Sequence, residues 1–131
     1  MYLDSSAFVK RYVDEDGTAK VQAAMATDER WTTCRVAFLE TARALRLSLC
    51  SGDTIDRFRR DWQAVRVVEV DRSLTEQATE LAVSHGLRSL DALHLAAALV
   101  ADPGDLTLAT WDRRLWTAGE ALGLRLLPEE L

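Results

Sequence analysis

Short apolar strands and helical stretches alternate along the whole chain, and this order constrains the fold more than any other feature. The segments typical of strands lie at 2–3, 31–33, 65–70, 106–110 and 124–127. Strands that alternate with helices form mostly parallel sheets with helices packed on their faces. We therefore predict an α/β fold, a three-layer α/β/α sandwich around a mostly parallel central sheet of about four to five short strands.

Helical periodicity occupies the intervals between these strands. The predicted helices lie at 7–13, 18–26, 35–50, 54–64, 73–85, 89–101 and 112–122. Ser5 and Ser6 are good N-cap residues for the first helix, and Ser73 with Glu76 forms a capping box for the fifth. The sixth is apolar on nearly every face, and the D-P-G segment at 102–104 is expected to end it. That helix is therefore expected to be buried.

Size and composition indicate one ordinary soluble domain. The 131 residues fit a single domain, 1–131, and are 48% hydrophobic and 28% charged. The sequence has no apolar run of about 18 residues and no basic leader before the first strand. We therefore expect a cytoplasmic protein without a membrane partner. Cys34 and Cys50 lack C-x-x-C spacing and are expected to be buried free thiols.

The net charge of −5 bears on nucleic-acid binding. A protein that holds nucleic acid mainly by neutralising phosphates is usually basic, so this balance counts against a generic nucleic-acid binder. It does not exclude a protein whose carboxylates hold metal ions that meet the phosphate.

Two carboxylates follow strands directly. Asp4 comes after the strand at 2–3, and Asp112 comes after the strand at 106–110. Either could simply cap the helix that follows it. In parallel α/β sheets, however, ligands bind at the carboxyl ends of the strands, where the strand order reverses. If the two strands are neighbours at that point, Asp4 and Asp112 face each other.

Two further carboxylates lie on apolar helices. Glu40 stands on an apolar flank of its helix, where a carboxylate is costly unless it is paired; an ion pair with Arg43 or another arginine is the alternative. Asp91 lies in the first turn of the most apolar helix. The helix dipole stabilises an acid there, but this would explain an exposed aspartate better than one set among leucines and alanines.

Together, Asp4, Glu40, Asp91 and Asp112 can converge on one pocket. Two like charges about 4 Å apart repel by about 4 kcal/mol at an effective dielectric constant of about 20. Such a cluster would hold protons or bind a cation. Oxygen ligands without cysteine or clustered histidine favour Mg²⁺ or Mn²⁺ over zinc. The four acids therefore predict a magnesium or manganese site.

The same acids lie in four sequence segments whose combination and order are more informative than any single motif. These are L-D-S-S-A-F-V-K-R-Y at 3–12, Glu40 in a helix, G-L-R-S-L-D-A-L-H-L-A-A-A at 86–98 and L-A-T-W-D-R-R-L at 108–115. In this order they resemble the PIN-domain ribonucleases, particularly the VapC-type toxins of type II toxin–antitoxin pairs. The likeness covers the full chain, and the four acids fall on the family's acidic positions.

The resemblance implies a PIN-like fold and a metal-dependent endoribonuclease in which the four acids are catalytic. Asp4, Asp91 and Asp112 would be the main ligands of Mg²⁺, with Mn²⁺ as a substitute, and Glu40 would complete the shell or position the attacking water. The resemblance also implies a structured RNA substrate (tRNA, rRNA or mRNA), a cognate VapB-type antitoxin and a homodimer.

Polar and basic residues near the acids are candidates for supporting roles. Ser6 and Thr110, each two residues from an acid, would orient that acid or the substrate, or would be plain caps. Arg88, Arg113 and Arg114 are candidates for phosphate contacts, with solvated surface as the alternative.

Two further residues have competing interpretations. His94, three residues from Asp91, is expected to be packed and hydrogen-bonded rather than a metal ligand, because leucines flank it. Trp111 could stack on a base, lie beneath the antitoxin or pack at the rim of the core.

Other functions fit the sequence less well. A receiver domain needs a lysine near its last strand, but Lys10 and Lys20 both lie early in the chain. A phosphatase with an aspartate nucleophile needs a second aspartate two residues after Asp4, where Ser6 stands. The alternative that remains is a non-catalytic RNA- or protein-binding PIN-like module.

Overall fold

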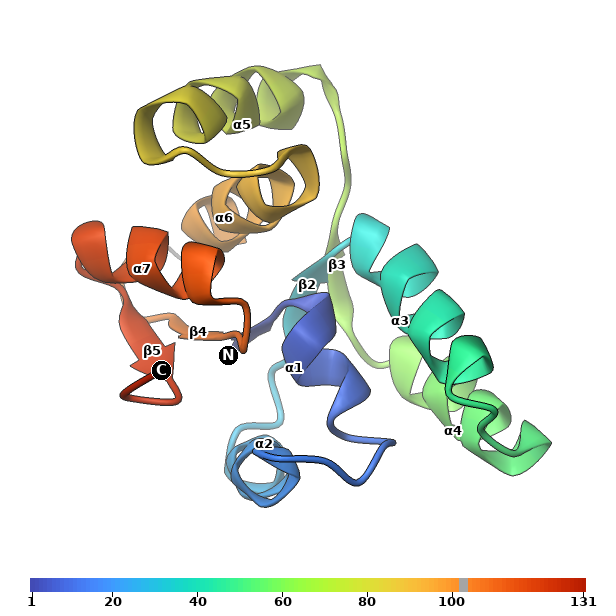
Figure 1. The fold of residues 1–131 in the computed structure, drawn as a ribbon. Coiled ribbons are helices and arrows are strands. Elements are labelled where there is room, and N and C mark those ends of the chain that lie inside the picture. The colour runs from blue at the N-terminus through green and yellow to red at the C-terminus, as the bar shows by residue number, and fades with distance from the viewer. Residues whose placement is uncertain (102–103) are drawn as a thin grey trace.

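A five-stranded parallel sheet forms the centre of the protein (Figure 1). The computed structural model describes residues 1–101 and 104–131. The strands are β1 Tyr2–Leu3, β2 Thr32–Cys34, β3 Arg66–Val68, β4 Thr107–Ala109 and β5 Arg125–Leu127. They lie in the order β3-β2-β1-β4-β5, and each pair of neighbours is parallel. The predicted α/β class and the parallel sheet are confirmed.

Helices cover both faces of this sheet. In the described part of the chain they are α1 Ser5–Val9, α2 Thr18–Thr27, α3 Val36–Leu47, α4 Gly52–Trp62, α5 Arg72–His85, α6 Ser89–Ala101 and α7 Arg113–Ala121. Helices α1 to α4 lie on one side of the sheet, and α5 to α7 lie on the other (Figure 1). This arrangement is the predicted three-layer sandwich.

Each face of the sheet has its own core, because successive side chains of a strand point to opposite faces. Tyr2 belongs to the core under α5, α6 and α7, whereas its neighbour Leu3 belongs to the core under α1 to α4. Helix α6 is buried as expected, and the small side chains of Ala96, Ala97 and Ala98 lie within the first core. The second core includes the packed aromatic rings of Phe8, Phe58 and Trp62.

Several predicted helix ends differ from the observed ones. Helix α1 begins at Ser5, two residues earlier than predicted, because Asp4 is its N-cap and accepts a hydrogen bond from the Ala7 N–H, and it ends at Val9 rather than Val13. Helix α5 is likewise capped by Asp71 rather than by the predicted serine capping box. In both cases a carboxylate is the cap, and it also interacts favourably with the helix dipole. Helix α3 ends three residues earlier than predicted. The predicted stop of α6 at 102–103 lies outside the described residues.

Two further expectations concern the thiols and the membrane. Cys34 is buried and Cys50 half-buried, and both are free thiols. Over residues 1–101 and 104–131, none of the helices has the length and apolar character needed to cross a membrane.

The strand order reverses between β1 and β4. From β1 the chain adds β2 and β3 on one side, and then adds β4 and β5 on the other. Leu3 is in register with Ala109, and the Asp4 N–H donates to the Ala109 carbonyl at 3.2 Å. The residues that follow β1 and β4 therefore lie side by side at the carboxyl edge of the sheet, as the sequence predicted for Asp4 and Asp112.

Helix α6 offers a test of this packing. Leu95 is fully buried between α6 and the sheet, so Leu95→Ala is expected to lower the free energy of unfolding by about 2–5 kcal/mol. Val100 lies on the same helix but is 52% exposed, and Val100→Ala is expected to change stability by less than about 0.5 kcal/mol. Urea unfolding of both variants checks this, and equal losses would contradict the assigned face of α6.

Candidate active site

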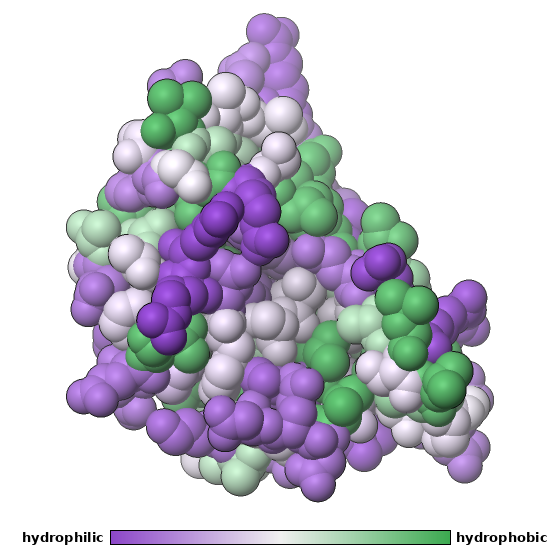
Figure 2. Space-filling model, in the orientation of Figure 1, coloured by the Kyte–Doolittle hydropathy of each residue, from purple (hydrophilic) through white to green (hydrophobic). Residues whose placement is uncertain are grey.

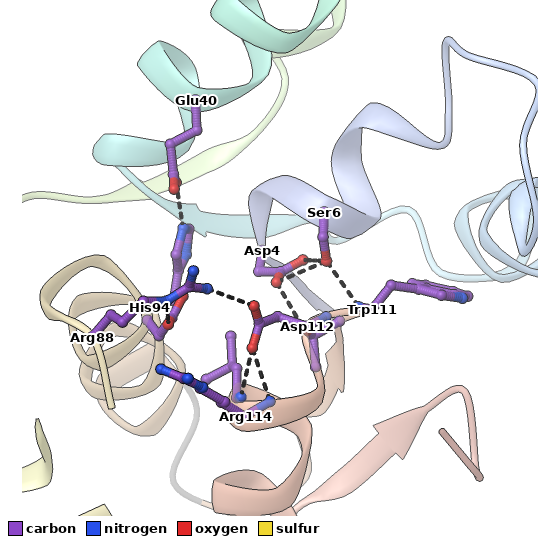
Figure 3. A network of polar contacts seen from close by, with 11 residues as sticks. Asp4, Ser6, Glu40, Arg88, His94, Trp111, Asp112 and Arg114 are labelled. Atoms are coloured by element: carbon purple, nitrogen blue, oxygen red, sulfur yellow. Dashed lines mark hydrogen bonds and ion pairs between the residues drawn. The ribbon is translucent and has the colours of Figure 1, made fainter. Parts of the chain in front are cut away.

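The Asp4 carboxylate is the most buried acid at the carboxyl edge of the sheet, with 3% of the residue exposed. The Ser6 hydroxyl lies 2.7 and 2.9 Å from its two oxygens, and the Thr110 hydroxyl donates to Oδ2 at 2.6 Å. The Ala7 N–H donates to Oδ1 at 2.8 Å. Both residues that the sequence singled out as supporting, Ser6 and Thr110, therefore contact this carboxylate (Figure 3).

Backbone groups of the segment after β4 orient the two hydroxyls. The Trp111 N–H donates to Ser6 Oγ at 2.8 Å, and the Asp112 N–H donates to Thr110 Oγ1 at 3.0 Å. Since each hydroxyl oxygen accepts one of these bonds, its own proton is directed to the acid. The chain after β4 thus stabilises the charge of Asp4 through Ser6 and Thr110.

Burial nevertheless dominates the protonation of Asp4. It raises the pKa of Asp4 above its ordinary value of 3.8, because removal from water disfavours the charged form. The nearby His94 and the hydrogen bonds from Thr110, Ala7 and Ser6 act in the opposite direction without reversing the shift. The positive charge and hydrogen bonds around Asp4 therefore do not fully compensate its ionised form.

Arg88 connects the next two acids, and its contact with Asp112 is drawn in Figure 3. Its Nε donates to Asp91 Oδ2 at 2.8 Å, and its Nη2 donates to Asp112 Oδ2 at 2.7 Å. The other oxygen of Asp112 caps α7 and accepts the N–H groups of Arg114 and Leu115 at 2.9 and 3.1 Å. Asp112 is thus both the helix cap and part of the acidic cluster, so the two interpretations of this residue hold together.

Glu40 reaches from α3 to α6 and contacts His94 (Figure 3). Its Oε2 lies 2.7 Å from His94 Nε2, and His94 Nδ1 lies 2.9 Å from the hydroxyl of Tyr2. His94 is almost fully buried and hydrogen-bonded on both ring nitrogens, as expected, and it rather than Arg43 is the partner of Glu40. Burial raises the pKa of Tyr2 well above its ordinary value, so this hydroxyl remains protonated.

The four acids thus lie at one edge of the sheet, but they do not form a ready metal cage. In the part of the chain that the structure describes, no group of three His, Cys, Asp or Glu side chains is placed to hold a metal ion. Between Asp91 and Asp112 the guanidinium of Arg88 takes the place that a shared cation would have. The donor chemistry is still that of a hard-metal site, because the acids offer only oxygen atoms.

Among the described residues, the side chains of the other basic and aromatic candidates make no hydrogen bond or ion pair with the four acids. The side chains of Arg113 and Arg114 are exposed at the start of α7. Trp111 points away from the carboxylates (Figure 3), with Lys10 Nζ 5.2 Å from its ring centroid, and it packs against Gly17. Gly17 has φ +88°, and a Cβ there would lie 2.5 Å from the indole. This packing favours the rim-of-core interpretation of Trp111.

Sequence reasoning missed two links in this site. The bridge that Arg88 makes between two acids was not expected, although its spacing of three residues from Asp91 puts both on one side of a helical turn. The contact of Tyr2 with His94 had no sequence signal, because the two residues are 92 positions apart.

Comparison with known proteins agrees with this fold. Residues 1–117 match the PIN domain family, to which the chain therefore belongs. Within it, the chain groups with the VapC ribonucleases: it is 38% identical over 140 aligned positions to Ribonuclease VapC45 of Mycobacterium tuberculosis, with 100% of this chain and 96% of that protein covered.

Solved structures show the same fold at low sequence identity. FitAcB from Neisseria gonorrhoeae has a TM-score of 0.66 and 17% identity, covering 95% of this chain and 94% of that one. A toxin–antitoxin complex from Klebsiella pneumoniae has a TM-score of 0.66 and 16% identity, covering 83% of each chain. The extension of the domain from residue 117 to 131 stays a prediction.

The environment of Asp4 generates a pH prediction. Because the pKa of Asp4 is raised in the folded protein, the unfolded chain loses this proton more readily. The contribution of Asp4 to the free energy of unfolding should therefore fall as pH rises from 3.8 through the raised pKa. The free energy of unfolding of Asp4→Asn minus that of the unmodified protein, both measured in chelator, is expected to be more positive at pH 7 than at pH 4. Urea unfolding across this range measures the difference, and a difference that shrinks as pH rises would contradict it.

Proposed function

We propose that this protein is a metal-dependent endoribonuclease toxin that is neutralised by an antitoxin. One observation supports the proposal: Asp4 and Asp112 follow the neighbouring strands β1 and β4, where the strand order reverses, and Arg88 links Asp112 to Asp91. Ligands bind at such points in open α/β sheets. The relatives named as VapC ribonucleases support RNA as the substrate.

The residues fit Mg²⁺, and Mn²⁺ would substitute for it. Asp4, Asp91 and Asp112 would hold the ion, and a bound divalent cation would polarise the scissile phosphate and lower the pKa of water. The contact of Arg88 with two of these acids supports this assignment, because the same oxygens already attract one cation. Ser6 and Thr110 hold Asp4 in one orientation.

Glu40 would act on the attacking water. Its contact with the buried His94 fixes the carboxylate at the edge of the site, and its side chain is still 24% exposed. A carboxylate held in this way can accept a proton from a water molecule within hydrogen-bond reach. His94 is proposed as the residue that positions Glu40.

The RNA would be bound locally. With a net charge of −5, the chain has little overall attraction for a polyanion, whereas the exposed Arg113 and Arg114 stand at the start of α7 beside Asp112. We propose that they contact phosphates of a structured RNA. Few phosphate contacts imply a shallow dependence of RNA affinity on salt concentration.

An antitoxin partner is supported by the toxin–antitoxin complex among the structural neighbours. We propose that it occupies the apolar groove between α3 and α4, which includes Phe38, Leu47 and Phe58. Figure 2 shows hydrophobic side chains gathered over these helices. Arginines at 43, 46 and 59 also line the groove, so it fits an amphipathic segment with acidic side chains. The homodimer and the cytoplasmic location remain proposals that rest on the family.

The catalytic proposal is tested by removing single charges. Asp4→Asn and Asp91→Asn are each expected to lower Mg²⁺-dependent RNA cleavage by about a hundredfold or more, because each substitution removes a charged oxygen from the site. Asp53→Asn, on the exposed first turn of α4, is the matched control and should cleave normally. Gel assays with structured RNAs measure the rates. Unimpaired cleavage by both site variants would reject the assignment, and tight RNA binding in chelator without any cleavage would favour the non-catalytic module.

The groove is tested separately. Leu47 is 65% exposed beside the groove arginines, so Leu47→Asp is expected to weaken binding of the antitoxin by about tenfold. Val83→Asp, at an 81% exposed position on α5, should leave that affinity unchanged. Calorimetric titration of the purified antitoxin measures both, and equal affinities of the two variants would place the antitoxin elsewhere.

A further inference from the structure

We propose that Arg88 is an internal cation that competes with the divalent metal ion for Asp91 and Asp112. In this role Arg88 lowers the affinity of the site for the ion and stabilises the metal-free protein. The inference rests on the proposed function, because it assumes that these two aspartates bind the metal. Beyond that function, the inference is that Arg88, a residue of the chain itself, regulates metal binding at this site.

The first support is the geometry of the bridge. One guanidinium spans both carboxylates, with its Nε 2.8 Å from Asp91 and its Nη2 2.7 Å from Asp112, and both contacts go to Oδ2 atoms. The planar fork of arginine allows it to hold two carboxylates at once. A metal ion shared by these same two oxygens would lie where the guanidinium is, so both cations cannot occupy the place together.

The second support is the difference in exposure between the partners. The side chain of Asp91 is 12% exposed and that of Asp112 is 27% exposed, whereas that of Arg88 is 62% exposed. The acids are also fixed: Asp91 lies in the first turn of the buried helix α6, and the other oxygen of Asp112 caps α7. Arg88 lies one residue before α6 begins and is the partner with freedom to move into solvent.

The third support is the charge around the bridge. Without Arg88 and without metal, Asp91 and Asp112 would face each other next to the buried Asp4, and like charges at such distances repel. Arg88 removes this repulsion in the metal-free protein. Displacement by a divalent ion would release the guanidinium at the mouth of the site, where a phosphate group would be its natural partner.

The test measures metal binding rather than activity. Mn²⁺ is titrated into the unmodified protein, Arg88→Gln and Arg88→Lys, with isothermal calorimetry as the readout. Arg72→Gln is the matched control, because Arg72 is 91% exposed and also pairs with a carboxylate, that of Glu76. Thermal unfolding of the same proteins is recorded in chelator and in saturating Mn²⁺.

Arg88→Gln is expected to bind Mn²⁺ about three- to tenfold more tightly than the unmodified protein, the size expected from the loss of two exposed ion pairs. Arg88→Lys should show a smaller gain, because an ammonium cannot span both acids as the fork does. In chelator the Tm of Arg88→Gln should fall by about 2–4 °C, while the rise in Tm on adding Mn²⁺ should be larger than in the unmodified protein. Arg72→Gln should bind Mn²⁺ like the unmodified protein.

Equal Mn²⁺ affinity of Arg88→Gln and the unmodified protein would overturn the proposal, as would an equal loss of Tm with and without Mn²⁺. If no variant binds Mn²⁺, both the metal site and the competition are rejected. If the competition is observed but no RNA is cleaved, the proposed ribonuclease activity fails while the role of Arg88 stands.

Discussion

The burial of the Asp4 carboxylate is the constraint on which the rest of the site depends. A negative charge at this depth is costly, and the chain compensates for it with two hydroxyls and a backbone N–H. Thr110 reaches Asp4 only because β1 and β4 are neighbours, and the Trp111 N–H reaches Ser6 for the same reason. The strand order and the burial of this acid therefore depend on each other. The pairing of β1 with β4 places the hydrogen-bond donors next to Asp4, and these donors stabilise its charge.

The remaining acids show how the protein balances a concentrated negative charge. Asp91 and Asp112 share Arg88, whereas Glu40 is paired with His94. Arg88 lies just before α6 and His94 lies on it. The same helix therefore carries Asp91 and, on it or next to it, the residues that pair with the acids. The chain as a whole is acidic, and the positive charge near the site is supplied by a few arginines rather than by a basic surface. Acidic side chains with a few arginines near them agree with a site that binds a cation through its carboxylates and contacts a phosphate group through the arginines.

Much of the fold could be predicted from the sequence. The alternation of strands and helices indicated the parallel sandwich, and the sequence pattern of α6 predicted its burial and its start at Ser89. Helix starts were harder, because Asp4 and Asp71 compete with nearby serines as caps and local pattern does not rank them. The alternative interpretation of Glu40, an ion pair with Arg43 or another arginine, was based on nearby residues, whereas the fold supplies His94, 54 positions away.

The sequence by itself determined the chemistry of the site: four acids, two hydroxyl residues next to strand ends and an all-oxygen set of donors. Local pattern is enough for this, because residue type and strand or helix position can be read from neighbours in the chain. Only the tertiary structure decided which groups meet. Arg88 between two acids and Tyr2 against His94 are contacts across different elements. Such contacts arise from strand order and helix packing, which depend on the whole chain and not on spacing within any one segment.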